Sequence, residues 1–125
     1  MNALKFTHAH EWLRVEADGS VILGITDYAQ EQLGDIVFVE LPDIGTHLNH
    51  DTNLVVIESV KAVGEVKLPV GGTVVGINQR LANEPELVNN APLAEGWLLR
   101  ITLDDAALLD TLMDANAYQA YITEL

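Results

Sequence analysis

The chain has 125 residues, of which 49% are hydrophobic, and six basic against nineteen acidic residues give it a formal net charge of −13. This length predicts one domain, residues 1–125, with a core of its own. The acidic balance argues against nucleic-acid binding and docking on anionic membranes, and no apolar run approaches the roughly 18 residues of a transmembrane helix. Because the chain has no cysteine, disulfides, thiolate zinc sites and cysteine nucleophiles are excluded.

The predicted elements are mostly short strands separated by turn residues, a pattern typical of a mainly β barrel or sandwich. Residues 12–16 and 20–25 flank Asp18-Gly19, a hairpin turn signal. Residues 27–33 predict a short helix with Asp27 as N-cap, Gln30 as its capping-box partner and Gly34 at the end. Further strands are predicted at residues 36–41, 54–58, 65–68, 73–78 and 97–103.

The C-terminal segment, about residues 104–124, changes to a helical period. After Asp104 and Asp105 an apolar stripe follows, formed by Leu108, Leu109, Leu112 and Met113. The pattern resumes at Tyr118 after a weak break at residues 114–116. We expect helices that pack over one open side of the barrel; the alternative is a helix offered to a partner.

One internal repeat is visible: V-x-L-P-x-x-G-T occurs at residues 39–46 and again at residues 66–73. Each proline is expected to end a strand or to lie at a sheet edge. Two similar β units that fold back on one another predict a flattened, pseudo-symmetric barrel. In that arrangement Lys61 falls between the two halves, at one exposed end.

Lys61 is the most informative residue of the chain. It lies in Glu58-Ser59-Val60-Lys61-Ala62, between two strand-like stretches, which predicts the tip of a β-hairpin. There its ammonium group stands clear of the body on a flexible four-carbon stem, available for covalent modification. With a pKa near ~10.4, free lysine is a poor nucleophile at neutral pH. Modification therefore requires an activated acyl donor and a dedicated ligase.

Several motifs, in order and spacing, resemble the H-protein family of the glycine cleavage system over nearly the whole chain. They are His10-Glu11-Trp12, residues 24–30, 33–42, 58–62 and 85–89, and Gly96-Trp97. The resemblance implies a barrel-sandwich hybrid fold with lipoate joined to Lys61 by an amide bond. Residues 63–68 depart from the family's usual small, acidic and aromatic pattern, although the spacing from Lys61 to Pro69 is kept.

The resemblance also implies roles for the neighbours of Lys61. Glu58 and Ser59 help to present the lysine to the modifying enzyme, with Val60 and Ala62 as supporting residues. Glu11 is the candidate for meeting the cationic aminomethyl group on the loaded arm.

By the same resemblance the protein is a non-catalytic carrier in glycine catabolism. Its partners are a pyridoxal-phosphate glycine decarboxylase, a tetrahydrofolate-dependent aminomethyltransferase, a dihydrolipoyl dehydrogenase, and a lipoate ligase or lipoyl transferase. A carrier whose tip enters several active sites is expected to be a monomer. The N-terminal residues favour a bacterial cytoplasm, or a mitochondrial matrix only if a transit peptide was trimmed.

Other interpretations remain open from the sequence. A biotinyl domain is disfavoured because methionine does not flank Lys61, and 2-oxoacid dehydrogenase lipoyl domains usually place Asp before the lysine. A lipoyl relay or storage protein, or an unmodified β-rich interaction module, is compatible with the altered residues 63–68. The pairs His8/His10 and His47/His50 are weak candidates for a metal-dependent enzyme, and no metal is expected.

Overall fold

The computed structural model describes residues 4–49, 53–67 and 71–125, which form two antiparallel sheets. The larger sheet has the strand order β1-β2-β3-β9-β8-β5. Its strands are β1 (Leu4–Phe6), β2 (Glu11–Val15), β3 (Val21–Ile25), β5 (His47–Leu48), β8 (Gly72–Ile77) and β9 (Leu99–Leu103). The smaller sheet has the order β4-β6-β7, formed by β4 (Ile36–Glu40), β6 (Asn53–Ser59) and β7 (Val63–Lys67). The prediction of a mainly β protein is confirmed.

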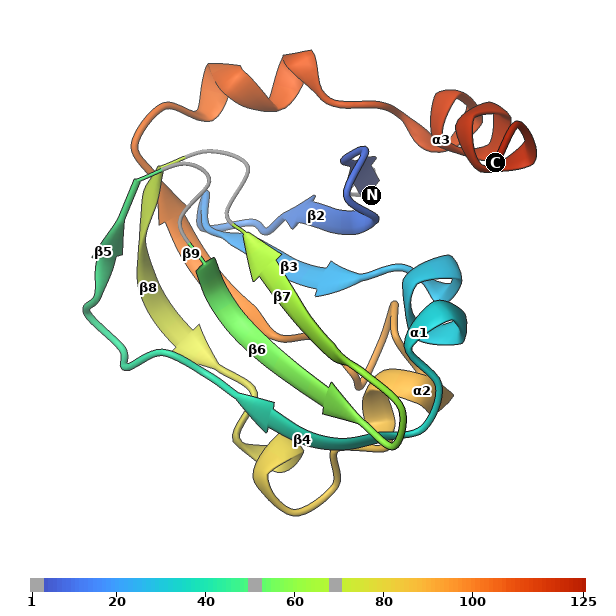
Figure 1. Cartoon of the computed structure of the whole chain (residues 1–125). Helices are drawn as coiled ribbons and strands as arrows, with labels where there is room; N and C mark the ends of the chain where they lie inside the picture. The colour runs from blue at the N-terminus through green and yellow to red at the C-terminus, as the bar shows by residue number, and fades with distance from the viewer. Residues whose placement is uncertain (1–3, 50–52, 68–70) are drawn as a thin grey trace.

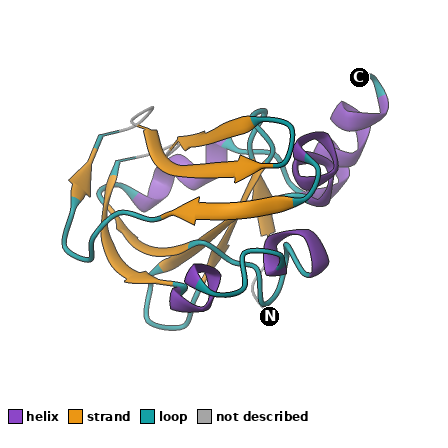
Figure 2. Cartoon of the chain, turned by 60° about the horizontal axis from the view of Figure 1, so that its bottom comes forward, coloured by secondary structure: helices purple, strands orange, loops and turns teal. Residues whose placement is uncertain are grey.

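The hydrophobic core lies between the two sheets, which Figures 1 and 2 show as two layers. Leu23 and Ile101 of the larger sheet and Ile57 of the smaller sheet are almost completely buried in one cluster. The helices α1 (Asp27–Leu33), α2 (Leu87–Asn90) and α3 (Ala115–Thr123) and the 3-10 helices Gln79–Ala82 and Ala106–Thr111 lie outside the sheets. The smaller sheet therefore packs against the larger one, with one face towards the core and the other face outward.

The predicted helix at residues 27–33 is confirmed as α1, with one correction at its start. Thr26, not Asp27, is the N-cap, and its side chain accepts a hydrogen bond from the backbone N–H of Ala29. The Asp27 carboxylate instead accepts a hydrogen bond from Gln30 Nε2 at 2.9 Å. Gly34 ends the helix as predicted, with the positive φ of 82° that glycine adopts at low cost.

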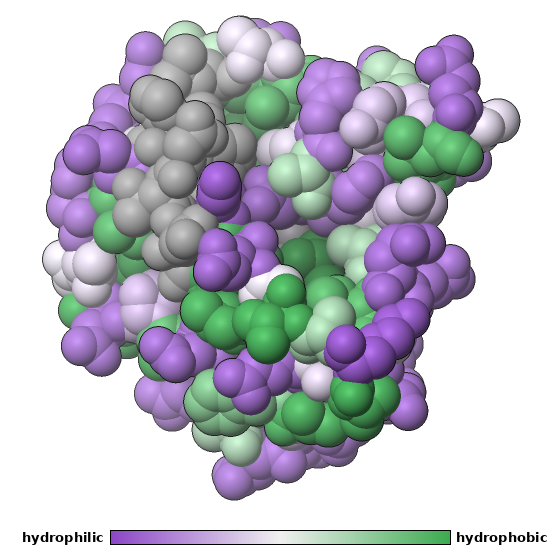
Figure 3. Space-filling view, viewed as in Figure 1, coloured by the Kyte–Doolittle hydropathy of each residue, from purple (hydrophilic) through white to green (hydrophobic). Residues whose placement is uncertain are grey.

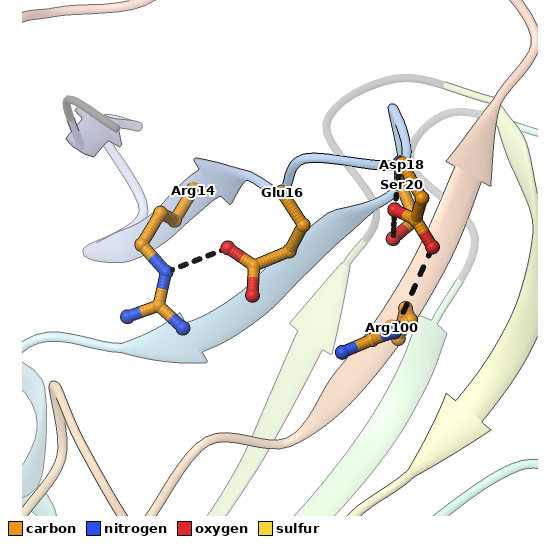
Figure 4. Close-up of polar contacts among 5 residues, drawn as sticks. All are labelled: Arg14, Glu16, Asp18, Ser20 and Arg100. Atoms are coloured by element: carbon orange, nitrogen blue, oxygen red, sulfur yellow. Dashed lines mark hydrogen bonds and ion pairs between the residues drawn. The ribbon is translucent and has the colours of Figure 1, made fainter. Parts of the chain in front are cut away.

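The β2–β3 hairpin turns at Asp18-Gly19 as predicted. The Asp18 carboxylate accepts hydrogen bonds from both the hydroxyl and the backbone N–H of Ser20, at 2.6 and 2.9 Å (Figure 4). Arg100 of β9 approaches the same carboxylate at 3.8 Å. The Ser20 hydrogen bonds, with a smaller contribution from Arg100, lower the pKa of Asp18. This turn therefore links the hairpin to the centre of the larger sheet.

The internal repeat places its two copies on either side of β6. Val39 of β4 and Val66 of β7 are both buried, and both strands pair antiparallel with β6. The Gly-Thr ends of the copies also meet, because Val74 N donates to Thr46 O at 2.9 Å beside the β5–β8 pair. This pairing supports the pseudo-symmetric interpretation. Pro69 lies outside the described residues.

The C-terminal segment differs from the predicted helix. Residues Ala106–Thr111 form a 3-10 helix capped by Asp105, and Met113 then pairs with Phe6 of β1 by two backbone hydrogen bonds. After this extended piece α3 begins, with Asp114 as its N-cap. Tyr118 of α3 is buried and stacks on Phe6 with a centroid distance of 4.6 Å. The segment thus packs against β1, the edge strand of the larger sheet.

Candidate functional site

Lys61 lies at the tip of the β6–β7 hairpin, in the three-residue connection of Val60, Lys61 and Ala62. All three residues are exposed, so the predicted hairpin tip is confirmed. Ser59 organises the turn: its hydroxyl oxygen accepts from the N–H groups of Lys61 and Ala62, at 3.3 and 3.0 Å. The backbone N–H of Ser59 also donates to Ala62 O at 2.8 Å. The backbone that bears the lysine is therefore held by its own short turn.

The turn is also attached to the body of the protein. The backbone N–H of Val60 donates to Asp35 O at 3.0 Å, which ties the hairpin tip to the turn between α1 and β4. The aliphatic stem of Lys61 crosses Gly34 in that turn, and a Cβ atom on Gly34 would lie 3.1 Å from Lys61 Cε. Gly34 thus ends α1 and leaves room for the stem, which lies towards α1.

Asn89 of α2 holds the α1–β4 turn in place. Its Oδ1 atom accepts from Ile36 N at 2.8 Å, while its Nδ2 group donates to Gly34 O at 2.9 Å and to Gln30 Oε1 at 2.8 Å. Sequence reasoning assigned no role to this residue, because its three partners lie more than fifty positions away. Asn89 is therefore an indirect support of the hairpin tip, acting through the turn that Val60 contacts.

A cleft of about 200 Å³ opens between the hairpin and α1. Its walls are largely apolar, with Leu33, Ile57 and Val66 among the lining residues. Glu11, at the start of β2, also lines it and is only 4% exposed. The Glu11 carboxylate accepts from Thr7 Oγ1 and from Lys67 N, both at 3.1 Å. A buried carboxylate with fixed orientation thus lies in an apolar cleft beside the lysine hairpin.

His10 lines the same cleft and joins it to the C-terminal helix. Its Nδ1 atom lies 2.9 Å from the hydroxyl of Tyr118, and its ring packs on Tyr28 with a centroid distance of 4.5 Å. Burial lowers the pKa of His10, and the neighbouring His8 lowers it further. Burial likewise raises the pKa of Tyr118. The environment of His10 therefore favours the neutral imidazole.

The two histidine pairs named as weak metal candidates lie in different parts of the fold. An arrangement of His8 and His10 on one face of a strand does not occur, because both residues lie in the turn between β1 and β2. His47 of β5 contacts Asp104 at 2.8 Å, and His50 lies outside the described residues. In residues 4–49, 53–67 and 71–125 no group of three or more His, Asp or Glu side chains is placed to hold a metal ion.

The structure separates the predicted site residues into two groups. Glu58, Ser59, Val60 and Ala62 surround Lys61 at the hairpin tip, where the Glu58 side chain is exposed. Glu11 lies apart from them, within the cleft. No sequence pattern indicates the cleft itself, because segments distant in the chain form its walls.

Comparison with known proteins agrees with this geometry. A family model described as "Glycine cleavage H-protein" matches residues 4–125. A glycine cleavage system H protein from Chromobacterium violaceum is 54% identical over 115 residues, covering 92% of this chain and 90% of the relative. One from Idiomarina loihiensis is 50% identical over 121 residues, covering 97% and 94%. The crystal structure of a glycine cleavage system H protein from Mycobacterium marinum superimposes with a TM-score of 0.87 at 30% identity, covering 98% of each chain.

The two-sheet fold is that of a lipoyl-type carrier domain, and the predicted barrel-sandwich fold is confirmed by this structural neighbour. The chain belongs to the glycine cleavage H-protein family. It is therefore a lipoyl carrier component of the glycine cleavage system, as the sequence resemblance implied.

In the described part of the chain, no helix combines the length and the apolar character needed to cross a bilayer.

Proposed function

We propose that Lys61 carries lipoate through an amide bond, and that the chain acts as one carrier domain of residues 1–125. The observation that carries this proposal is an exposed lysine on an ordered hairpin tip, in a chain of the H-protein family. A lysine on a flexible stem is the usual attachment point for such a group. A lipoate ligase or lipoyl transferase would form the bond, since the lysine requires an activated acyl donor.

When attached, the lipoyl group would supply a disulfide that accepts the aminomethyl group of glycine, and the dithiol that remains after this group is passed on would be reoxidised to the disulfide. The proposed partners are the pyridoxal-phosphate glycine decarboxylase, the tetrahydrofolate-dependent aminomethyltransferase and the flavin-dependent dihydrolipoyl dehydrogenase. The chain itself supplies attachment and reach, and tethering raises the concentration of the reactive sulfur at each partner. The bacterial relatives support a bacterial cytoplasm as its location, and we propose that it works there as a monomer.

The cleft fits the chemical character of a lipoyl group. Its apolar walls suit a hydrocarbon chain, and the Lys61 stem already lies towards α1, which forms one wall. Glu11 adds one buried carboxylate, which suits a cationic amine at the end of a loaded arm. We therefore propose that the loaded arm folds into this cleft and that its cationic end meets Glu11.

Replacing Glu11 by glutamine tests the proposed contact between Glu11 and the cationic end of the loaded arm. Hydrogen bonds to charged groups contribute about 1.5–3 kcal/mol, so Glu11→Gln is expected to speed loss of the aminomethyl group to water about tenfold or more. The rate is followed by intact-mass spectrometry of the isolated loaded protein. Glu65→Gln is the matched control, because Glu65 also lines the cleft but is exposed. Equal rates for the two variants would contradict the proposed contact.

The attachment itself is tested by intact-mass spectrometry of the protein from its native host, with peptide mapping of residues 54–80. A lipoyl-sized increment on Lys61 is the expected result. An unmodified Lys61, in a host whose other lipoyl proteins are modified, would overturn the proposal and favour an interaction module. An increment on Lys67 instead would move the attachment point along the same hairpin.

A further inference from the structure

His10 has a backbone conformation that is uncommon for a residue with a side chain. Its φ is 67°, and among the described residues other than glycine it alone has a positive φ. Strain of this kind persists where the surrounding structure holds it, often at a functional site. His10 directly precedes Glu11, and its side chain lines the cleft between the hairpin and α1. Figure 3 shows apolar side chains in this hollow.

Three tyrosines surround the imidazole ring of His10. Tyr28 and Tyr121 pack against it with centroid distances of 4.5 and 5.8 Å. Tyr118 of α3 meets it edge-on at 5.8 Å, and the Tyr118 hydroxyl lies 2.9 Å from His10 Nδ1. The same hydroxyl shares a second hydrogen bond, of 2.7 Å, with Thr26 Oγ1 at the N-cap of α1. One buried oxygen atom thus joins the C-terminal helix to His10 and to α1.

The pair formed by His10 and Tyr118 lies between two cavities. His10 lines the cleft of about 200 Å³, whereas Tyr118 lines a second cavity of about 330 Å³ between α1 and α3. These two helices lie on the same side of the molecule (Figure 1). Within the described part of the chain, the two cavities share no lining residue. If the imidazole ring turned away from Tyr118, the cleft would open towards the second cavity.

An opened cleft would expose the group that the proposed function places beside Glu11. Loss of the aminomethyl group to water breaks its carbon–sulfur bond. The sulfur keeps the electron pair and takes a proton, and the carbon leaves with the water oxygen as formaldehyde while ammonia departs. Water that enters the cleft supplies this reaction and also weakens the attraction between a carboxylate and a cationic amine.

We propose that Tyr118 is a positioning residue for the loaded arm, an inference that rests on the proposed function. Its hydroxyl holds the imidazole ring of His10 as a wall of the cleft beside Glu11. Tyr118 does not itself line the cleft, so it acts through His10. The C-terminal helix thereby shields the bound amine from water, although it lies far from Lys61 in the sequence.

Replacing Tyr118 by phenylalanine removes the hydroxyl and keeps the ring that stacks on Phe6. The lipoylated chain is loaded by the decarboxylase with glycine, isolated, and followed by intact-mass spectrometry. Because the net free energy of one hydrogen bond corresponds to a change of a few-fold in rate, Tyr118→Phe should lose the aminomethyl group about fivefold faster than the parent chain.

Tyr121→Phe is the matched control for this experiment. Tyr121 lies on the same helix and also packs on His10, but its hydroxyl donates to His8 O at 3.2 Å. The variant therefore keeps the hydrogen bond between Tyr118 and His10, and it should lose the aminomethyl group at the parent rate.

A double-variant experiment shows whether Tyr118 acts through His10. Glycine adopts a positive φ at low cost, so His10→Gly removes the imidazole ring without straining the turn. His10→Gly should speed the loss at least as much as Tyr118→Phe does. Adding Tyr118→Phe to His10→Gly should then have no further effect, whereas two independent effects would multiply.

A second measurement needs no loaded arm. In the unloaded chain, ¹⁵N NMR of the imidazole nitrogens reports the tautomer and the hydrogen bonds of each histidine. Tyr118→Phe should shift the His10 signals and leave those of His47 in place, because His47 contacts Asp104 and lies on β5, at the opposite edge of the larger sheet from β1. Unchanged His10 signals would overturn the inference.

The outcomes separate this inference from the proposed function. If the parent chain takes up no aminomethyl group on a lipoylated Lys61, the proposed function fails. If it does, and Tyr118→Phe loses the group at the parent rate, the inference alone fails. It also fails if Tyr121→Phe speeds the loss equally, or if the effects of Tyr118→Phe and His10→Gly multiply. If far-UV circular dichroism shows Tyr118→Phe to be unfolded, His10→Gly decides, and loss at the parent rate would overturn the inference.

Discussion

Replacing Lys61 by arginine is expected to reduce glycine cleavage by the reconstituted system to its background rate. The guanidinium of arginine stays charged and delocalised at every accessible pH, so it forms no amide with an activated acyl group. The replacement keeps the positive charge and the length of the exposed side chain, so the hairpin tip should remain folded. The measurement is the release of carbon dioxide from glycine with the three partner enzymes in excess.

Lys67→Arg is the control for this experiment. Lys67 is an exposed lysine at the far end of β7, on the same hairpin as Lys61. Its replacement should leave both lipoylation and glycine cleavage intact. Full activity of the Lys61→Arg chain, or its loss in the Lys67→Arg chain, would contradict the assignment of the carrier lysine.

Replacing Trp12 by alanine is expected to lower the free energy of unfolding by about 3–5 kcal/mol, the usual cost of removing a buried aromatic side chain. Trp12 is fully buried, and its Nε1 group donates to Pro92 O at 2.9 Å. Its ring fills the space beside Gly24 on β3, where a Cβ atom would lie only 2.5 Å from the indole. The loss would be a large fraction of the roughly 5–15 kcal/mol that stabilises a typical domain.

Urea denaturation followed by far-UV circular dichroism measures this loss without relying on tryptophan fluorescence. Trp97→Ala is the matched control, because Trp97 is only partly buried and packs at the margin of the same cluster. Trp97→Ala should lower the free energy of unfolding by clearly less than Trp12→Ala does. If the two variants lost equal stability, the complete burial of Trp12 beside Gly24 would not be the reason for its large contribution.

Local signals in the sequence are sufficient to predict several elements of the fold. The helix at residues 27–33 and the Asp18-Gly19 hairpin each depend on neighbours within a few positions, and both are confirmed. The sequence pattern predicts the N-cap one residue late because two adjacent residues, Thr26 and Asp27, are both good caps. The hairpin tip at Lys61 was predictable for the same reason, since Ser59 forms its turn within the pentapeptide.

Contacts between distant segments account for what the sequence did not predict. The strands β1 and β5 are too short to show an alternation of apolar and polar residues. They form because they pair with β2 and β8. The helix expected around Met113 is interrupted because that residue pairs with Phe6, more than a hundred positions away. The buried Glu11 carboxylate likewise accepts a hydrogen bond from the backbone N–H of Lys67, which only the folded chain brings beside it.

The turn built on Ser59 has a consequence for the thermodynamics of docking. A disordered loop that becomes fixed on binding loses backbone entropy, at a cost of about 1–2 kcal/mol for each residue ordered. Here the backbone of Lys61 and Ala62 is already held by the Ser59 hydroxyl, and Val60 is held by Asp35. An enzyme that receives this tip immobilises only the lysine side chain and whatever that side chain carries, so the free energy of docking does not include the cost of ordering the backbone of the turn.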